Sequence, residues 1–396
     1  MTQIDCNKIF VPGGFPERTY YSRSELKLEE KIKRSSMHSI LVVSGHTKLG
    51  KTVLVRNLYP KNEKDTVWID GGTISSIDDL WDKIIVHYDE YHSEQISQHV
   101  DAGVNAKSRV PFFTGGGHFS EGSSHVRKRD VGKRVKAIDI IEKNKPILII
   151  DDFHYIKKEI QKEIIQAFKP LIFEGVRIIL IVIPHKRYDS AMVEKEMTGR
   201  INIIEIPSWK KDELIEIPKM GFEIMGVEVP EKAIKTMVEN SLGSPHLMQQ
   251  FCYEFCMDYP DSDIESVLKR IAQNMGRPMY DKISRGPRQR SDRKIRNLIN
   301  GDETDIYGLI LHALAHIKPS LETLEYEQIR KAIREIAKPN SIPQMHEVTR
   351  VLEKMSEIAS ADRGSVPAID FDKENERLHI TDPFFAFFLR WGILEV

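Results

Sequence analysis

The feature that most constrains the fold is a short apolar run that ends at a glycine and is followed by a lysine and a threonine. The stretch SILVVSGHTKLGKTVLVRNL occupies residues 39–58. Its β-branched and leucine residues predict a buried strand, its glycines predict a tight loop, and the residues after the loop have a helical pattern. The loop satisfies the phosphate-binding spacing G-x-x-x-x-G-K-[ST], and its residues are Gly45, His46, Thr47, Lys48, Leu49, Gly50, Lys51 and Thr52.

The chemistry of phosphate binding needs each part of this loop. Glycines let the backbone turn so that successive N–H groups point inward at phosphate oxygens. A helix that begins near Lys51 and continues through Val53 adds its positive N-terminal end. The Lys51 ammonium is expected to reach the β- and γ-phosphates of a nucleotide, and the Thr52 hydroxyl is expected to ligate Mg²⁺.

A second apolar run, about a hundred residues further on, ends in two adjacent carboxylates. It is KPILIIDDFHYI, residues 145–156, and the carboxylates are Asp151 and Asp152. We expect Asp151 to hold the Mg²⁺ shell and Asp152 to orient or polarise the attacking water. Aspartate is one methylene shorter than the glutamate usual at the second position, so we expect slow hydrolysis, below roughly 10 per second.

The chain as a whole alternates short β-branched runs with helical patterns, which predicts an α/β fold with a parallel sheet covered by helices. The runs are nearly continuous in Ile, Val and Leu, as in strands buried on both faces. Helices are predicted at 51–59, 76–88 and 158–172. We predict strands at 39–45, 66–70, 146–151, 177–183 and 201–206.

The regions outside this sheet divide the chain further. Residues 91–136 are rich in glycine, serine and charge, and we expect a flexible insert there. After residue 207 the strand pattern stops, and helical patterns run to about residue 280. A basic stretch interrupted by proline, residues 280–298, marks a boundary. The expected domains are therefore a core at 1–207, a helical region at 208–297 and a last domain at 298–396.

The bulk composition limits the environment of the protein. The formal net charge is -1, so any contact with nucleic acid must come from a local basic patch. We expect the cysteines Cys6, Cys252 and Cys256 to be thiols, with the last two buried on one helix face, which suits a reducing cytoplasm. No apolar run approaches the roughly 20 residues of a membrane span, so we expect no membrane contact.

Two further basic positions are candidates for sensing the γ-phosphate. The sequence IPHKRYD places His185, Lys186 and Arg187 just beyond the fourth predicted strand, and we favour Arg187 because strand ends line the ligand crevice of an open sheet. Arg200 immediately precedes the fifth predicted strand. It could act as an arginine finger on the γ-phosphate of a neighbouring subunit.

With these motifs in place, nearly the whole chain resembles the AAA+/STAND branch of P-loop ATPases, especially archaeal-type ATPases and origin initiators. SGHTKLGKT and ILIIDDF are similar to the Walker A and Walker B motifs, and GRINIIEIPSWKKDELIEI is similar to the segment that leads into the helical lid. The resemblance implies a P-loop NTPase fold, with a five-stranded parallel sheet, a helical lid and a C-terminal winged-helix domain. It also implies ATP and Mg²⁺ as cofactors.

The same resemblance extends to the lid and to both ends of the chain. Gly243-Ser244-Pro245 matches a lid motif that packs near the base, so Pro245 and His246 are candidate nucleotide contacts. Residues 9–32 occupy the place of a segment that covers the adenine, and ERLHITDPFFAFFLRW is similar to the end of the winged domain. His246 stands where many AAA+ proteins have a sensor arginine, and IPHKR replaces the usual Asn or Thr, which favours a STAND-like protein.

The function predicted from these features is an ATPase of low turnover that acts as a nucleotide-controlled switch on a partner protein, in defence or mobile-element control. The expected partners are further copies of the chain, another protein, or both. The alternative is a DNA-associated AAA+ ATPase, such as an initiator, loader or transposition regulator. Its support is local, from the basic segments 127–136 and 282–296. A small-molecule kinase is disfavoured by the absence of a second phosphate-acceptor motif.

Overall fold

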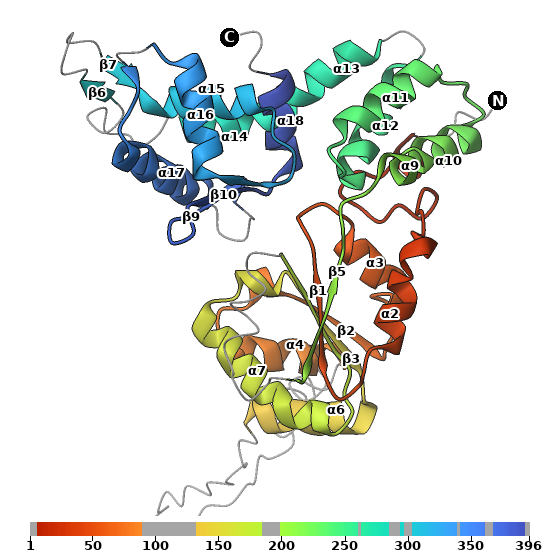
Figure 1. The fold of residues 1–396 in the computed structure, drawn as a ribbon. Coiled ribbons are helices and arrows are strands. Elements are labelled where there is room, and N and C mark those ends of the chain that lie inside the picture. The colour runs from red at the N-terminus through yellow and green to blue at the C-terminus, as the bar shows by residue number, and fades with distance from the viewer. Residues whose placement is uncertain are drawn as a thin grey trace, which may run out of the picture. The chain divides into compact units, whose positions relative to one another are not determined.

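The computed structural model of the chain describes residues 6–88, 132–183, 199–259, 263–284, 294–296, 303–338, 341–360 and 367–392. It contains a parallel five-stranded sheet with the order β2-β3-β4-β1-β5 (Figure 1). The strands are β1 (Ile40–Ser44), β2 (Thr66–Asp70), β3 (Ile147–Asp151), β4 (Ile178–Val182) and β5 (Ile201–Glu205). All five predicted strands and the α/β fold class are therefore confirmed.

Helices cover both faces of the sheet because its central strands, β1 and β4, are almost entirely apolar. All five residues of β1 and all five of β4 are buried. One face packs against α4 (Ile77–His87), α6 (Lys133–Asn144) and α7 (Lys158–Phe173), which share one apolar core with the strands. Figure 1 shows α2 (Leu28–Arg34) and α3 (Lys51–Leu58) on the other side of the sheet.

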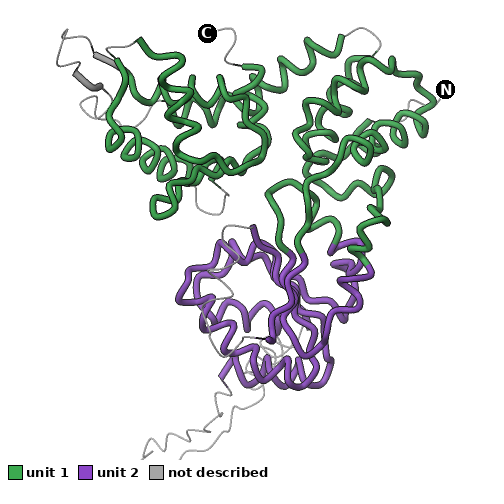
Figure 2. Tube along the Cα trace, viewed as in Figure 1, with its two compact units in different colours: residues 1–29, 44–54, 205–396 green, residues 30–43, 55–204 purple. Residues whose placement is uncertain are grey.

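Contacts divide the chain into two compact units, and neither is continuous in sequence (Figure 2). One unit comprises residues 30–43 and 55–204 and contains most of the sheet. The other comprises residues 1–29, 44–54 and 205–396, so the residues of the phosphate-loop motif belong to the same unit as both termini. The three-domain division at residues 207 and 297 stays a prediction.

The unit that contains the phosphate-loop motif has a largely helical core. It begins with α1 (Cys6–Ile9) and continues, beyond residue 205, with α9 (Lys211–Leu214), α10 (Glu216–Met225), α11 (Glu231–Asn240) and α12 (Pro245–Asp258). Then α13 (Ile264–Ile271) and α14 (Arg277–Ser284) flank a wide π-helical turn at Ala272–Gly276. A Cβ at Gly276 would lie 2.3 Å from the Cβ of Phe388, so this turn allows close packing against α18 (Pro383–Trp391).

The last part of this unit combines helices with a small antiparallel sheet. Its helices are α15 (Ile306–Ile317), α16 (Tyr326–Ile336), α17 (Met345–Ala359) and α18. Strands β8 (Thr323–Glu325), β9 (Ile369–Asp372) and β10 (Arg377–Ile380) form a sheet in the order β8-β10-β9. A separate pair joins β6 (Lys294–Arg296) to β7 (Glu303–Asp305).

Several sequence expectations are corrected by this description. Strands do occur after residue 207, but β6–β10 have only three or four residues each, too few for an alternating pattern to stand out. Helix α6 begins at Lys133, inside the range predicted for the insert, because Ala137, Ile140 and Ile141 are buried on one face of it. The remaining insert residues, 91–131, lie outside the described residues.

The cysteines also differ from the expectation. Cys6 and Cys256 form a disulfide, and of the three cysteines only Cys252 stays a thiol, buried in the helical core. Residue spacing placed Cys256 beside Cys252 but gave no sign of Cys6, which is 250 positions away. Among the helices that the structure describes, none is both long and apolar enough to cross a membrane. A cytoplasmic location stays a prediction.

Candidate nucleotide site

The phosphate-loop motif lies between the end of β1 and the start of α3, as predicted. The residue after β5 fixes where the loop begins, because the Ile206 N–H donates to the Ser44 carbonyl oxygen at 2.6 Å. A Cβ at Gly45 would come within 2.9 Å of the Ile206 carbonyl oxygen, so only glycine fits there. At the other end, Gly50 has a φ of +88°, a conformation that favours glycine.

The Lys51 side chain turns back over this loop. Its ammonium donates to the carbonyl oxygens of Gly45 and His46, both at 2.7 Å, and the residue is only 7% exposed. A buried cation held by loop carbonyls is positioned to receive an anion at the same loop. Thr52 and Val53 follow in the first turn of α3 and are half-buried.

Residues from beyond β5 contact the outside of the loop. The Trp209 indole N–H donates to the Leu49 carbonyl oxygen at 3.1 Å, and the Ser244 hydroxyl donates to the Lys48 carbonyl oxygen at 3.0 Å. Ser244 also caps α12, because its hydroxyl accepts from the Leu247 N–H. Each of these carbonyls shares a planar peptide unit with the N–H of the next residue, so the two contacts also help to orient the N–H groups of Leu49 and Gly50.

Arg23 anchors the connection that carries Trp209. Its guanidinium pairs with both carboxylate oxygens of Glu213 at 2.8 Å and also donates to the Pro207 carbonyl oxygen at 2.8 Å. The same guanidinium lies over the Trp209 ring, 5.0 Å from the ring centroid. A bidentate and stacked arginine of this kind restricts the indole to one orientation.

The Lys48 side chain contacts α18, the last helix that the structure describes. Its ammonium pairs with the carboxylate of Asp382, the N-cap of α18, and lies 4.4 Å from the centroid of the Phe384 ring. The His246 ring packs edge-on against the same phenylalanine at 5.4 Å. Burial, with a further contribution from the Lys48 charge, lowers the pKa of His246 to about 4, although Asp382 opposes this.

The paired carboxylates lie at the end of β3, as predicted. Asp151 is the last residue of the strand and is in register with Asp70 of β2. Asp152 adopts a left-handed conformation with φ of +51°, and its N–H donates to the Asp151 carboxylate at 3.1 Å. Gly71 allows this turn, because a Cβ there would lie 2.5 Å from the Asp152 carbonyl oxygen.

The remaining candidates are placed as follows. Arg200 immediately precedes β5, its carbonyl oxygen accepts from the Ile40 N–H at 2.8 Å, and its side chain is exposed. Arg187 lies outside the described residues, together with His185 and Lys186. Of the basic segments, residues 132–136, 282–284 and 294–296 are described and the others are not.

Sequence reasoning missed Trp209 and Asp382. For Asp382 one signal existed, since Asp before Pro383 and an apolar run predicts a helix start. Nothing in the sequence indicated that this cap would also pair with Lys48. Pro245 lies near the loop, because a Cβ at Gly50 would be 3.9 Å from its ring, whereas His246 faces Phe384.

Comparison of the whole structure with solved structures identifies the fold. The Walker-type ATPase of Pyrococcus abyssi is similar over 96% of this chain and 97% of its own, with a TM-score of 0.58 and 16% sequence identity. The chain has a P-loop NTPase fold. RuvB, a Holliday junction branch migration motor of Thermotoga maritima, covers 90% of the chain and 92% of its own, with 13% identity and a TM-score of 0.40. No protein-family profile matches the sequence, and a comparison with curated proteins finds no match.

Proposed function

We propose that this protein binds ATP with Mg²⁺ and hydrolyses it slowly, as a member of the AAA+/STAND class. The observation that supports the proposal most is the buried Lys51 ammonium, which is held by the carbonyls of a G-x-x-x-x-G-K-T loop directly after a strand of a parallel sheet. The residues present fit a triphosphate, because glycine at positions 45 and 50 keeps the backbone of the loop accessible to phosphate oxygens.

The chemistry follows from the residues at the two strand ends. The carboxyl ends of parallel strands point the same way, so we propose that Asp151 of β3 and Thr52 of α3 hold Mg²⁺. The ion would neutralise charge on the phosphates. Asp152 would accept a hydrogen bond from the attacking water, and Lys51 would stabilise the charge that develops on the transferred phosphate.

The direct test is calorimetric titration of the full chain with Mg·ATP and a non-hydrolysable analogue. Lys51→Ala should abolish measurable binding, because it removes the buried cation that is expected to contact the β- and γ-phosphates. Asp152→Asn should bind with unchanged affinity and lose turnover. A wild-type turnover above roughly 10 per second, an ordinary enzymatic rate, would contradict the slow hydrolysis proposed here.

We further propose that ATP acts as a switch. This proposal is supported by the residues that contact the loop, because they belong to elements that follow the sheet in sequence. These residues are Trp209, Ser244 and Asp382. A triphosphate at the loop would compete with Asp382 for the Lys48 charge. Residues 208–297 would then act as a helical lid and residues 298–396, with their helices and β8-β10-β9 sheet, as a winged-helix domain whose position reports the nucleotide.

The output of such a switch would be engagement of a partner protein or of a second copy of the chain. Arg200 is exposed and is our candidate for a residue that acts on the γ-phosphate of a neighbouring subunit. If this is so, the wild-type hydrolysis rate per chain should rise with protein concentration, and Arg200→Ala should remove that rise. If the hydrolysis rate per chain is independent of protein concentration, Arg200 does not act on a neighbouring subunit. It would then either act within its own subunit or have no role in hydrolysis.

A DNA-associated ATPase is the second candidate, favoured by six basic residues against one acidic residue within 127–136. Contacts with several phosphates make affinity fall steeply with salt. Retention on DNA at 50 mM salt and its loss by 200 mM would support this function. No retention at 50 mM, with or without an ATP analogue, would exclude it.

A further inference from the structure

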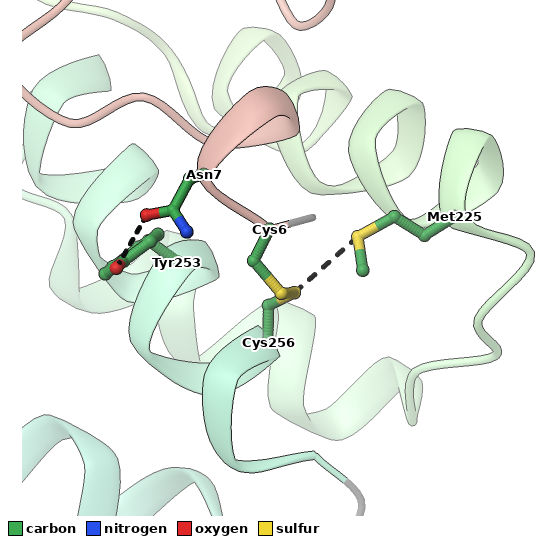
Figure 3. The surroundings of a disulfide bond; sticks show 5 residues. All are labelled: Cys6, Asn7, Met225, Tyr253 and Cys256. Carbon is green, nitrogen blue, oxygen red and sulfur yellow. Dashed lines mark hydrogen bonds between the residues drawn. A yellow bond between two sulfur atoms is a disulfide. The ribbon is translucent and has the colours of Figure 1, made fainter. Parts of the chain in front are cut away.

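The N-terminal segment lies along one face of α12. The Tyr253 hydroxyl donates to the Asn7 side-chain oxygen at 2.9 Å, and the Val11 N–H donates to the Gln249 side-chain oxygen at 3.1 Å. Cys6 is bonded to Cys256 at one end of this row, with 6.3 Å between the two Cα atoms (Figure 3). At the other end, a Cβ on Gly13 would lie 3.7 Å from the His246 ring.

The partners of this segment on α12 have the spacing of a single helix face. They are separated by three, four and three positions, which places them in one stripe along the helix. Successive residues of the segment therefore pair with successive turns of α12, in the opposite chain direction. The partners, in order from the disulfide, are Cys256, Tyr253, Gln249 and His246.

Apolar packing holds the middle of the segment. Ile9 and Phe10 have no exposed surface, and the Phe10 ring packs at 4.9 Å against the Phe222 ring. Thr19 closes the segment on itself, since its hydroxyl donates to the Ile9 carbonyl oxygen at 3.1 Å and accepts from the Gln249 amide at 2.8 Å. The segment would therefore stay attached to the core without the disulfide, but its first turn would lose a covalent anchor.

The N-terminal end of α12 is also the part of the lid that contacts the phosphate loop. Ser244 donates to the Lys48 carbonyl oxygen, and the Pro245 ring lies near Gly50. His246, the next residue, is the one beside Gly13. The C-terminal end of α12 therefore contains the disulfide, and its N-terminal end contacts the phosphate loop. Segment 6–13 runs along the helix between these two ends.

We propose that the Cys6–Cys256 bond is a redox-controlled clamp that slows nucleotide release from the phosphate loop. This inference rests on the proposed function. While the bond is intact, residues 6–13 are fixed along α12 and hold the helix start, with Ser244 and Pro245, against the loop. When the bond is reduced, the first turn of the segment loses its covalent anchor on α12, the helix is freer to move away from the loop, and nucleotide dissociates faster.

The switching reaction is thiol–disulfide exchange with a dithiol reductant. One thiolate of the reductant attacks a sulfur of the bond and forms a mixed disulfide, and its second thiolate then displaces the protein sulfur. Two electrons and two protons pass to Cys6 and Cys256, which become thiols, and the reductant becomes a disulfide. Cys6 is half-buried and Cys256 is 8% exposed, so Cys6 is the more accessible sulfur for attack.

Cys252 provides a matched control. It lies one turn from Cys256 in α12 and is fully buried, and burial raises the pKa of its thiol well above the usual value. A thiol that stays protonated exchanges slowly, because the thiolate is the nucleophile. Cys252→Ser should therefore leave the clamp and its redox response intact.

The experiment measures the dissociation rate of a fluorescent ATP analogue from the full chain, before and after treatment with dithiothreitol. We expect release to be about tenfold faster from the reduced wild type. Cys6→Ser and Cys256→Ser should release at the fast rate in both conditions, and Cys252→Ser should behave like wild type. Equal rates from oxidised and reduced wild type, or a redox response that survives in Cys6→Ser, would overturn the proposal.

Two measurements that need no nucleotide separate this inference from the proposed function. Thiol titration of the denatured protein should find one thiol before reduction and three after it. Trypsin should cut faster after reduction at Lys8, whose side chain is exposed next to the clamp. If both hold but no analogue binds in either state, the proposed function fails and the clamp has no nucleotide to act on. Three thiols before reduction, or equal cleavage in both states, would overturn the clamp itself.

Discussion

The two groups of residues proposed to meet the triphosphate are fixed in different ways. The phosphate loop is held by contacts with residues distant in sequence. Trp209 is 160 positions, Ser244 196 positions and Asp382 334 positions from the loop residue that it contacts. The carboxylate pair is held by the sheet itself, with Asp151 in the β3 ladder and Gly71 of the neighbouring connection allowing the turn at Asp152.

This difference has a consequence for how substitutions should act. Changes in the elements after β5 should reach nucleotide binding through the loop and leave the carboxylates in place. Changes beside β3 should alter hydrolysis and leave binding intact. Substitutions and pH changes on each side of the site therefore test whether the two groups of residues are independent.

The largest change in the free energy of unfolding is expected from lowering the pH, through His246 near the phosphate loop. The pKa of His246 is lowered from 6.5 to about 4, because burial and Lys48 disfavour its cation more than Asp382 favours it. The unfolded chain therefore binds a proton more readily than the folded one, so the free energy of unfolding should fall as pH drops from about 6.5 to about 4. The loss is at most about 3 kcal/mol.

Urea unfolding of wild type and His246→Gln at several pH values between 7 and 4 would measure this effect. The substitution should remove the His246 contribution and make the pH dependence shallower in that window. Identical pH dependence in the two proteins would mean that His246 is solvated in the folded state.

The next effect concerns the carboxylate side. Gly71→Ala would place a methyl group 2.5 Å from the Asp152 carbonyl oxygen, and a backbone atom cannot rotate away. We expect the free energy of unfolding to fall by about 1–3 kcal/mol. Hydrolysis should slow because the Asp152 turn shifts, while the affinity for an ATP analogue stays the same.

Gly72→Ala is the matched control for this substitution. The nearest atom to its added methyl group is a carboxylate oxygen of Asp70 at 3.2 Å, at the end of a side chain that can move. It should cost little stability and preserve turnover. A loss of ATP binding in Gly71→Ala comparable to its loss of hydrolysis would show that the two groups of residues are not independent.

Much of the fold could be predicted because the signals were local. Strands β1, β3 and β4 of the large sheet are nearly continuous apolar runs, and the loop after β1 is a fixed spacing of residue types, so both follow from neighbouring positions in the sequence. The helical spacing of the aromatic residues in α18 predicts a core face, and Phe384, Phe385, Phe387 and Phe388 are all buried.

The parts that could not be predicted depend on pairs of distant residues. From its residue type alone, Lys48 would be expected at the surface without a specific partner. Only the folded chain brings Asp382 to it. Cys256 has a nearer cysteine on its own helix face, yet Cys6 is its partner because α1 packs on that helix. One sequence gives no information about which distant positions come into contact. The phosphate-loop motif could therefore be identified, but the distant residues that contact the loop could not.

A smaller effect on ATP binding should distinguish the N-cap residues of two helices, Ser244 of α12 and Asp263 of α13. Ser244→Ala removes the cap of α12 and also the hydrogen bond to the Lys48 carbonyl oxygen. Asp263→Ala removes the cap of α13, where the carboxylate accepts from the Glu265 and Ser266 N–H groups. Each should lower the free energy of unfolding by about 1 kcal/mol.

Only the first of these caps touches the phosphate loop. Ser244→Ala should weaken ATP binding by roughly 2- to 10-fold, the range expected for loss of one hydrogen bond. Asp263→Ala should leave binding unchanged at the same loss of stability. Equal weakening of binding in both variants would attribute the effect to general destabilisation and not to the loop contact.

The smallest effect is expected from the Lys48–Asp382 pair. Asp382→Asn keeps the cap of α18, because asparagine caps a helix as well as aspartate does, and it removes only the charge. Both side chains are 25% exposed, so the pair should contribute about 0.5–1 kcal/mol to stability, less at high salt.

The direction of its effect on ATP distinguishes two roles for the pair. Without the carboxylate, the Lys48 charge is available to the triphosphate, so Asp382→Asn should bind ATP roughly 2- to 5-fold more tightly at low salt, and the gain should shrink as salt is added. Glu353→Gln, which removes the partner of Lys373 on the surface, should leave affinity unchanged. Weaker binding in Asp382→Asn would mean that the carboxylate shapes the loop for phosphate, in which case the switch would depend on Ser244 and Trp209 and not on competition for Lys48.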